Sequence, residues 1–212
     1  MTTVAVVDYG TGNVHSVGRM LTDLGVEWVH TRQPDTLRAA THLLMPGVGH
    51  CGQAMSCLAA SGTAELLSEL VLRDGVPVLG ICLGMQLMTR RSEEGPTRCL
   101  GWFEADTTRI APMDRKTFKV PNIGWHAVLG FSPATRVFTA IDTASRPFYF
   151  CHAYGVRAAG VADASATFDY ETGYVAALER DNIVGVQFHP EKSQDVGRAL
   201  MGNFLKMGRR HV

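Results

Sequence analysis

Short apolar runs alternate with segments of helical periodicity along residues 1–90, and this alternation limits the possible folds more than any other feature. The runs expected to form strands are residues 4–7, 26–29, 43–45 and 76–81. Helical spacing of apolar side chains is found at residues 17–24, 66–71 and 83–90. Strands that alternate with helices favour a parallel sheet, because each crossover helix packs back onto the sheet. We therefore predict an α/β fold whose mostly parallel central sheet is covered by helices.

The remainder of the chain has a different pattern. Residues 100–188 contain short β-rich pieces separated by turn signals, and they predict a mixed, β-rich C-terminal half. The clearest pieces are residues 156–168, 174–178 and 183–188. Val196, Leu200 and Phe204 then recur at helical spacing and predict a closing helix, with Ser193 as its N-cap. No linker or repeat interrupts the sequence, so residues 1–212 are expected to form one domain.

The composition is that of a globular protein and argues against two classes of partner. Hydrophobic residues make up 46% of the chain and charged residues 19%, which is enough apolar material for a full core. The 20 Lys and Arg residues balance 20 Asp and Glu residues, so no net charge attracts nucleic acid or an anionic membrane. No apolar stretch approaches the ~20 residues that span a bilayer. We expect neither a nucleic-acid nor a membrane partner.

The cysteine and histidine residues show no disulfide or metal-site pattern. The 5 cysteines are odd in number and lack C-x-x-C spacing, which argues against a zinc ribbon and favours a reducing compartment. No basic segment with an apolar signal core precedes the first strand. None of the 8 histidines stands in an H-E-x-x-H motif. These features predict a cytoplasmic protein without a metal.

A cysteine stands at a predicted strand-to-helix turn, in the segment Gly-Ile-Cys-Leu-Gly at residues 80–84. This is the sequence context of a nucleophile elbow, with Cys82 where many hydrolases have serine. The flanking glycines permit a tight turn, and the N-terminus of the following helix favours the thiolate. The backbone N–H of Leu83 would point toward a developing oxyanion. Alone, the pattern is equally compatible with a buried structural cysteine.

A second segment, Val-Gln-Phe-His-Pro-Glu at residues 186–191, also follows a predicted strand. The rigid proline keeps it extended, so His189 and Glu191 can project toward one region. A carboxylate on one imidazole nitrogen leaves the other free to accept a thiol proton. A lone His-Pro-Glu more often holds a loop or core histidine. The two segments together favour catalysis, because each supplies what the other lacks and both lie at strand ends.

Three other features are open to two interpretations each. Gly-Thr-Gly at residues 10–12 suggests dinucleotide binding, but His15 replaces the third glycine and no acidic residue ends the second strand. A tight turn or a partner contact is the better interpretation. His152 is an alternative base, although a structural or substrate-loop role fits better beside His189. Trp125 is either a core residue or an interface aromatic.

At these segments the chain resembles the class I, triad-type glutamine amidotransferases. Residues 80–86, Gly-Ile-Cys-Leu-Gly-Met-Gln, match the nucleophile motif of that family, and residues 188–191, Phe-His-Pro-Glu, match its His-x-Glu motif. The resemblance implies that Cys82 is the nucleophile, His189 the base and Glu191 the acid that orients it. The implied reaction hydrolyses L-glutamine to glutamate and ammonia and requires no metal or organic cofactor.

The resemblance also implies the binding residues. Pro-Gly-Val-Gly at residues 46–49 resembles the second oxyanion loop of the family, so Gly47 and Val48 are expected to complete the oxyanion hole with Leu83. Without the other motifs this loop would be an ordinary glycine-rich turn. The residues expected to bind glutamine are Gly49, Gln86, His152, Ala153 and Tyr154.

Further segments resemble one branch of the family, the glutaminase subunits of imidazole glycerol phosphate synthase. They are residues 8–13, 46–49, 121–125, 149–154 and 189–194. This resemblance implies a heterodimer in histidine biosynthesis, in which a (β/α)8-barrel cyclase subunit receives the ammonia. The residues implied at the docking face are Asn13, Trp125, Tyr149 and Lys192. The chain departs from the branch at His126, where Asn is usual, and at Cys51, where Phe is common.

Two other functions remain open at the level of sequence. One is a hydrolase with the same triad, such as another amidotransferase or a γ-glutamyl hydrolase. The other is a non-catalytic regulatory partner that keeps the fold, which the three filled triad positions disfavour.

Overall fold

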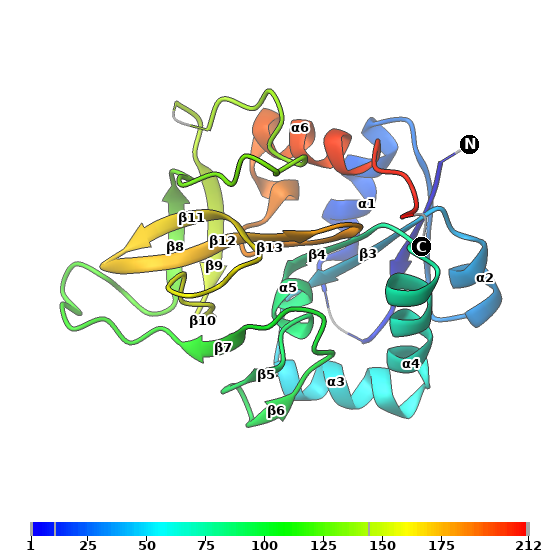
Figure 1. The fold of residues 1–212 in the computed structure, drawn as a ribbon, viewed down its shortest axis with the longest axis horizontal. Coiled ribbons are helices and arrows are strands. Elements are labelled where there is room, and N and C mark those ends of the chain that lie inside the picture. The colour runs from blue at the N-terminus through cyan, green and yellow to red at the C-terminus, as the bar shows by residue number, and fades with distance from the viewer. Residues whose placement is uncertain (1, 11, 144, 211–212) are drawn as a thin grey trace.

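The computed structural model of the chain describes residues 2–10, 12–143 and 145–210. Its centre is a seven-stranded sheet with the strand order β11-β12-β13-β4-β3-β1-β2 (Figure 1). The strands are β1 (Thr3–Val7), β2 (Glu27–Thr31), β3 (His42–Gly47), β4 (Val78–Cys82), β11 (Ala164–Tyr170), β12 (Thr172–Arg180) and β13 (Ile183–Val186). From β2 to β13 neighbouring strands are parallel, whereas β12 and β11 continue the sheet antiparallel. The predicted mostly parallel sheet with a mixed C-terminal part is confirmed.

Helices cover both faces of the central sheet (Figure 1). One face carries α1 (Val14–Asp23) and α6 (Gln194–Phe204). The other face carries α2 (Pro34–Ala39), α3 (Cys51–Ala60), α4 (Thr63–Ser68) with the π-helical turn Glu69–Arg73, and α5 (Leu83–Leu87). Because strand side chains alternate, Val4 and Val6 belong to the first core and Ala5 and Val7 to the second. The sheet therefore separates two apolar cores.

The C-terminal half adds two smaller sheets beside the central one. The first has the order β10-β7-β5-β6, with β5 (Arg91–Ser92), β6 (Thr97–Arg98), β7 (Asp106–Arg109) and β10 (Tyr154–Gly155). The second is the antiparallel pair of β8 (Asn122–His126) and β9 (Phe148–His152). Phe148 and Phe150 of β9 are buried, and their rings pack against Phe188, just beyond β13. This aromatic contact holds the β8–β9 pair beside the ends of the central strands.

Several elements differ from the sequence predictions. The strand predicted at residues 156–168 is wrong in its first half, because Gly160 has φ 79° and a turn precedes β11. Helix α3 was not predicted.

Ser193 does stand at the N-cap position of α6, but its hydroxyl makes no capping bond. Instead it donates to the carbonyl of His189 and accepts from the N–H of Tyr149. Thr11, within the predicted glycine turn, lies outside the described residues.

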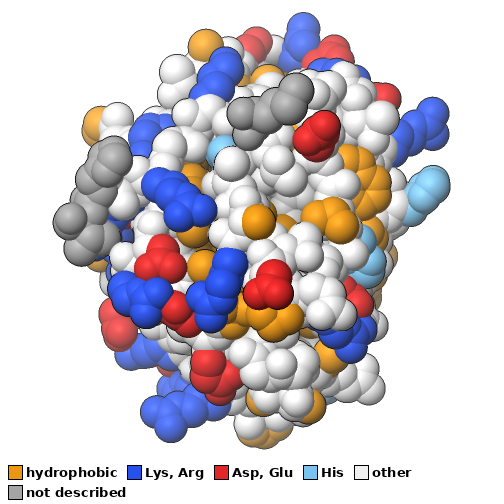
Figure 2. All heavy atoms as spheres, turned by 90° about the vertical axis from the view of Figure 1, so that its right-hand side faces the viewer, with side chains coloured by type: hydrophobic (Ala, Val, Ile, Leu, Met, Phe, Trp, Pro, Cys, Tyr) orange, Lys and Arg blue, Asp and Glu red, His pale blue; other side chains and the backbone are white. Residues whose placement is uncertain are grey.

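Basic and acidic side chains are interspersed on the face that lies on the side of α2 and α4 (Figure 2). Ion pairs such as Arg38–Glu69 join α2 to the π-helical turn after α4. Within the described ranges, no single helix has the length and apolar composition to cross a membrane. The pair Cys51–Ala60 and Thr63–Arg73, bent by 91°, meets those criteria only when taken together.

Candidate active site

Cys82 ends strand β4 and immediately precedes helix α5. Its backbone has φ 52° and ψ −103°, which a residue other than glycine adopts only when its surroundings enforce it. A Cβ on Gly80 would lie 2.6 Å from the backbone of Gly84, and one on Gly84 would lie 1.8 Å from the carbonyl oxygen of Met45. The two glycines therefore let the turn close onto itself and onto β3. This strained strand-to-helix turn has the form of a nucleophile elbow.

His189 and Glu191 form a buried pair just beyond strand β13. Nδ1 of His189 lies 2.8 Å from Oε1 of Glu191, and the two side chains are 1% and 2% exposed. The short 3-10 turn Pro190–Lys192 carries Glu191 back toward the ring. Nε2 of His189 is buried and makes no hydrogen bond to the described residues. One ring nitrogen is thus held by a carboxylate and the other is available for a proton.

The environment of His189 favours its protonated form. Burial lowers the pKa of His189, but the interactions with Cys82 and Glu191 outweigh burial and raise the pKa to about 10. The ring can therefore hold a proton taken from the Cys82 thiol at neutral pH. A thiolate beside an imidazolium is the reactive form of a cysteine nucleophile.

The two predicted segments meet because their strands are neighbours in the sheet. Strand β13 pairs in parallel with β4, with Val186 opposite Ile81, so the residues that follow each strand lie side by side. Gln187, the residue after β13, donates its Nε2–H to Sγ of Cys82 at 3.6 Å. The elbow and the His-Pro-Glu segment therefore lie at the carboxyl ends of neighbouring strands, although about half of the chain separates them.

A cavity of about 280 Å³ opens beside Cys82, which is one of its lining residues. The other predicted residues that line it are Val48, Gly49, Leu83, Gln86, His152, Ala153 and Tyr154. Its volume, near the low end for ligand pockets, suits a small ligand such as an amino acid. Glu94, Pro121 and Cys151 also line the cavity and were not predicted. Pro121 and Cys151 belong to the segments 121–125 and 149–154 that resemble the synthase branch, although neither was assigned to the cavity, and Glu94 belongs to no such segment.

The predicted oxyanion residues surround the start of α5. Gly47 lies opposite Cys82 in the pairing of β3 with β4, and Leu83 is the first residue of α5. The N–H of Leu83 is therefore one of the four amides that no helical carbonyl can satisfy. Gly47 is buried, and a Cβ there would lie 2.6 Å from Cβ of Leu83. Val48 is exposed and lines the cavity.

Tyr9 is hydrogen-bonded to the loop at residues 46–49 and was not predicted as a site residue. It is 1% exposed, and its hydroxyl donates to the carbonyl oxygen of Pro46. Burial and, to a smaller extent, Cys82 raise the pKa of Tyr9 above its usual range. The hydroxyl therefore remains a donor and holds the backbone just before Gly47.

His152 lies in the cavity wall and is a poor candidate for the base. Burial lowers the pKa of His152 to about 4, so the ring is neutral at physiological pH. Its Nδ1–H donates to the carbonyl of Tyr154 at 2.8 Å, and its Nε2 accepts from Asn122 at 3.2 Å. Both nitrogens are occupied within the protein. The structure therefore agrees with the structural or substrate-loop interpretation of His152.

Three of the four predicted docking residues form one exposed group. Trp125 is 46% exposed, and its ring meets that of Tyr149 edge to face at 5.6 Å. The ammonium of Lys192 lies 5.4 Å from the centroid of the same Tyr149 ring. The interpretation of Trp125 as a core residue is thus wrong. Asn13, the fourth, caps α1 by accepting from the N–H of Ser16.

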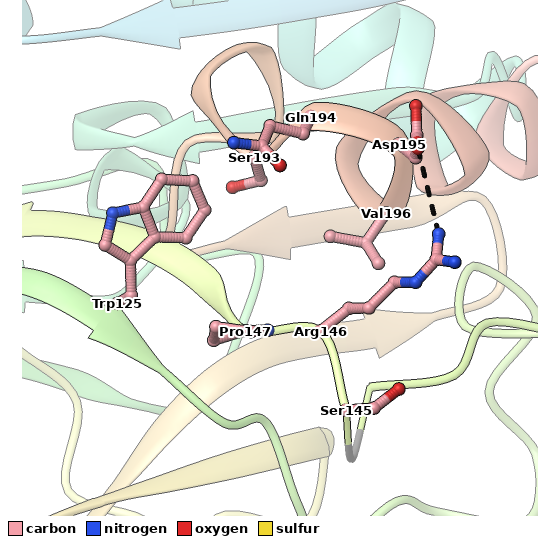
Figure 3. A pocket seen from close by; sticks show the side chains of 8 residues that line it. All are labelled: Trp125, Ser145, Arg146, Pro147, Ser193, Gln194, Asp195 and Val196. Atoms are coloured by element: carbon pink, nitrogen blue, oxygen red, sulfur yellow. Dashed lines mark ion pairs between the residues drawn. The ribbon is translucent and has the colours of Figure 1, made fainter.

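A second cavity, of about 370 Å³, adjoins this exposed group (Figure 3). Its wall combines Trp125 of β8, the segment before β9 and the start of α6. Arg146 and Asp195 form an ion pair in this wall, with Nη1 and Oδ2 3.8 Å apart. Among the residues that the structure describes, no group of three or more His, Cys, Asp or Glu side chains could hold a metal ion.

Comparisons with known proteins agree with this geometry. Residues 5–207 match the model of the family described as Glutamine amidotransferase class-I. The chain is 39% identical over 203 residues to imidazole glycerol phosphate synthase subunit HisH 2 of Methanococcus maripaludis, covering 96% of this chain and 98% of that protein. It is 42% identical over 205 residues to imidazole glycerol phosphate synthase subunit HisH of Bacteroides fragilis, covering 96% and 99%.

Solved structures share the fold at lower sequence identity. A glutamine amidotransferase from Thermotoga maritima superposes with a TM-score of 0.63 at 14% identity, covering 97% of this chain and 98% of that chain. PurLQS from Thermotoga maritima gives a TM-score of 0.74 at 16% identity, covering 96% and 97%. At these identities the likeness concerns the fold alone.

Proposed function

The chain belongs to the class I glutamine amidotransferase family, and from this premise we propose that it is the glutaminase subunit of an imidazole glycerol phosphate synthase. It hydrolyses L-glutamine to glutamate and ammonia and supplies the ammonia to a cyclase subunit in histidine biosynthesis. The near-complete overlap with the relatives named HisH supports this assignment over another branch of the family.

The reaction is acyl transfer to cysteine. His189 takes the thiol proton of Cys82, and the thiolate attacks the side-chain amide carbon of glutamine. The backbone N–H groups of Leu83 and of the loop at Gly47 and Val48 stabilise the oxyanion of the tetrahedral intermediate. His189 then gives its proton to the leaving ammonia, and Glu191 keeps the ring oriented and stabilises its charge.

Hydrolysis of the thioester completes the cycle. His189, now neutral, removes a proton from water, which attacks the thioester carbon and releases glutamate from Cys82. The raised pKa of His189 supports the first proton transfer, because the ring beside Cys82 and Glu191 binds the thiol proton firmly. No cofactor is needed for any step.

The cavity beside Cys82 is the glutamine site. Gly49, Gln86, His152, Ala153 and Tyr154 bind the substrate directly or shape its wall. Glu94 contributes a carboxylate to this wall, which is suited to the α-ammonium group of glutamine. Polar groups at both ends of a small cavity fix the orientation of an amino acid, so that its side-chain amide reaches the nucleophile.

The partner is a (β/α)8-barrel cyclase subunit, and the complex is a heterodimer in the cytoplasm. The exposed group of Trp125, Tyr149 and Lys192, together with Asn13 at the start of α1, forms the docking face. Helix α1 packs against the turn Pro190–Lys192, so this face adjoins the triad. A partner that covers it keeps ammonia from being protonated and lost to solvent.

The observation that supports this function most is the buried His189–Glu191 pair beside the strained Cys82 turn at the edge of an amino-acid-sized cavity. The test is to co-express the chain with its native cyclase partner and to measure glutamate release with and without it. L-glutamine should be the substrate, and glutamine should drive cyclisation in the complex. Preferential hydrolysis of γ-glutamyl peptides, or no glutamate release in the complex, would contradict the proposal.

A further inference from the structure

We propose that Gln187 is a further catalytic residue, whose side-chain amide donates a hydrogen bond to the Cys82 sulfur and stabilises its thiolate, and that Gln86 orients this donor. The inference rests on the proposed function only in taking Cys82 as the nucleophile. It gives Gln86 a role toward the nucleophile in addition to its role toward the substrate.

The first step is the contact with sulfur. Gln187 Nε2 lies 3.6 Å from Cys82 Sγ, and the Gln187 side chain is fully buried. On another side, Sγ lies 3.8 Å from the carbonyl oxygen of Cys151, to which only a protonated thiol can donate. The carbonyl favours the thiol and an amide N–H favours the thiolate. The hydrogen bond from Gln187 therefore counteracts the effect of the Cys151 carbonyl on the Cys82 thiol.

The second step is the orientation of the Gln187 amide. Gln86 Nε2 lies 2.9 Å from the carbonyl oxygen of Tyr154 and 3.1 Å from Gln187 Oε1. A backbone carbonyl only accepts, so the Gln86 atom facing it must be the NH2 group. The same NH2 group also faces Gln187, which must present its oxygen there. The NH2 group of Gln187 is then left to face the sulfur.

The third step is what fixes the Tyr154 carbonyl. It accepts a second hydrogen bond, from Nδ1 of His152 at 2.8 Å. With a proton on Nδ1, Nε2 of neutral His152 is an acceptor for Asn122 Nδ2, whose Oδ1 accepts in turn from Nε2 of His126 at 2.8 Å. Each donor in this series finds an acceptor. Every amide and ring from His126 to Gln187 thus has one permitted orientation.

The chain of bonds connects three elements that are distant in sequence. His126 and Asn122 belong to β8, His152 to β9, and Gln86 to α5. Gln86 is 4% exposed and Asn122 is fully buried, so water does not compete freely for their bonds. A satisfied buried network of this kind holds its last member, Gln187, more firmly than packing alone would.

Other titratable groups lie around Cys82 and must stay constant in any test. His189 is the base, Glu191 is bonded to it, Tyr9 lies beneath the loop, and Glu94 lines the cavity. Substitutions at Gln187 and Gln86 leave all four unchanged. Gln187→Met adds no charge, so a change in the reactivity of Cys82 in that variant reports the amide donor.

The experiment measures alkylation of Cys82 by iodoacetamide across pH 5–10, with the modified peptide identified by mass spectrometry. Iodoacetamide is small and reacts directly with a thiolate, so it does not have to be bound as glutamine is. In Gln187→Glu the side chain still accepts from Gln86 but presents an oxygen to the sulfur. In Gln187→Met the volume is kept and the donor is lost. Thermal denaturation of each variant checks the fold.

We expect the alkylation rate at pH 7 to fall by roughly tenfold in Gln187→Met and by up to roughly a hundredfold in Gln187→Glu, since bonds to charged groups are the strong ones. The pH of half-maximal alkylation should rise in the same order. In the complex, the kcat for glutamine should fall with little change in KM. The inference would be overturned if both variants were alkylated as fast as the wild-type protein and with the same pH of half-maximal alkylation.

Gln86→Glu is the sharpest variant because it acts at a distance. An ionised carboxyl group at this position has no donor for Gln187, so the Gln187 amide turns its NH2 group toward residue 86 and its oxygen to the sulfur. Alkylation of Cys82 should slow as in Gln187→Glu, which a role in substrate binding alone would not cause. This variant also carries the test if the Gln187 variants fail to fold, and normal alkylation in it would refute the inference. Absence of glutaminase activity in the wild-type complex would instead refute the proposed function and leave the alkylation result standing.

Discussion

Gly197 of helix α6 lies against the carbonyl oxygen of Pro190, so closely that a Cβ on Gly197 would stand 1.9 Å from that oxygen. Pro190 separates the two residues of the His189–Glu191 pair. The hydroxyl of Ser193 holds the same turn by donating to the carbonyl of His189 at 2.7 Å. Helix α6 is therefore the support that keeps the base and its carboxylate in place.

The first prediction follows from this support. Gly197→Ala should push the His189 turn away from α6, lower the stability by about 1–3 kcal/mol and reduce glutaminase activity by at least roughly tenfold. Chemical denaturation and glutamate release measure the two effects. Gly202→Ala is the matched control on the same helix, because nothing lies within 4 Å of a Cβ there. That variant should be neutral or slightly stabilising. The same stability and the same glutaminase activity in the two variants would contradict the role of α6.

The second prediction concerns the nucleophile. Cys82→Ala should lower glutamine hydrolysis by at least about a thousandfold, because no covalent intermediate can form. The complex that carries it should still use free ammonium, since only the ammonia supply is lost. Both rates are measured in the same preparation. Near-normal glutamate release by this variant would exclude the mechanism.

The third prediction separates the base from its neighbours. His189→Ala should be nearly as damaging as the loss of Cys82. Glu191→Gln should leave measurable activity, because an amide still holds the ring but stabilises imidazolium less well. His152→Ala should be milder than His189→Ala in kcat, because His152 is neutral and both of its nitrogens are occupied. A reversed order for the two histidines would show that the base is assigned wrongly.

The fourth prediction is a pH dependence of stability. The pKa of His152 is lowered to about 4 by burial, below the value of about 6.5 in the unfolded chain. The folded state therefore binds fewer protons at this site than the unfolded state. The resulting contribution of about 3 kcal/mol is present above pH 6.5 and is lost as the pH falls from 6.5 to 4.

Urea unfolding between pH 4 and 8 tests this dependence, with His152→Gln as the comparison. The variant should be less stable at pH 7, but its stability should decline less steeply toward pH 4. Parallel stability curves for the two proteins would refute the contribution of His152.

The fifth prediction concerns docking. Trp125→Ala and Lys192→Ala should lower glutamine-dependent synthesis more than ammonia-dependent synthesis, because the first requires a sealed contact between the subunits. Both variants should remain folded, since both side chains are exposed. Equal losses with the two nitrogen sources, or an unchanged affinity for the cyclase partner, would rule out the docking face.

The sequence predicted the inner part of the central sheet well because the strands there are almost entirely apolar. Strands β1, β3 and β4 are buried on both faces, and their apolar runs stand out against the polar turns. Helix α3 was missed because its side chains are mostly small and only Cys51, Ala54 and Leu58 are buried. The contrast between its faces is too weak for a periodic signal.

The site was predictable where residues stand in motifs and was missed where they act singly. The family resemblance behind Cys82, His189 and Glu191 is confirmed by the family match, and their individual roles remain predictions. Tyr9 and Gln187 stand inside the segments 8–13 and 186–191, yet nothing in either segment assigns them a role, and Glu94 stands in no motif. Gln187 meets Gln86 across 101 positions of sequence, a pairing that only the folded chain reveals.

Strand β13 takes its place between β4 and β12, although it follows all the other strands in the part of the chain that the structure describes. A nascent chain that ends before residue 183 carries Cys82 on an open strand edge, with neither its base nor the strand that brings that base. By the proposed mechanism such a chain cannot release ammonia, however well its first four strands have folded. The bare edge of β4 is also the segment where an unfinished chain is most exposed to pairing with a foreign strand. Synthesis itself thus delays the proposed activity until residue 191 has been added.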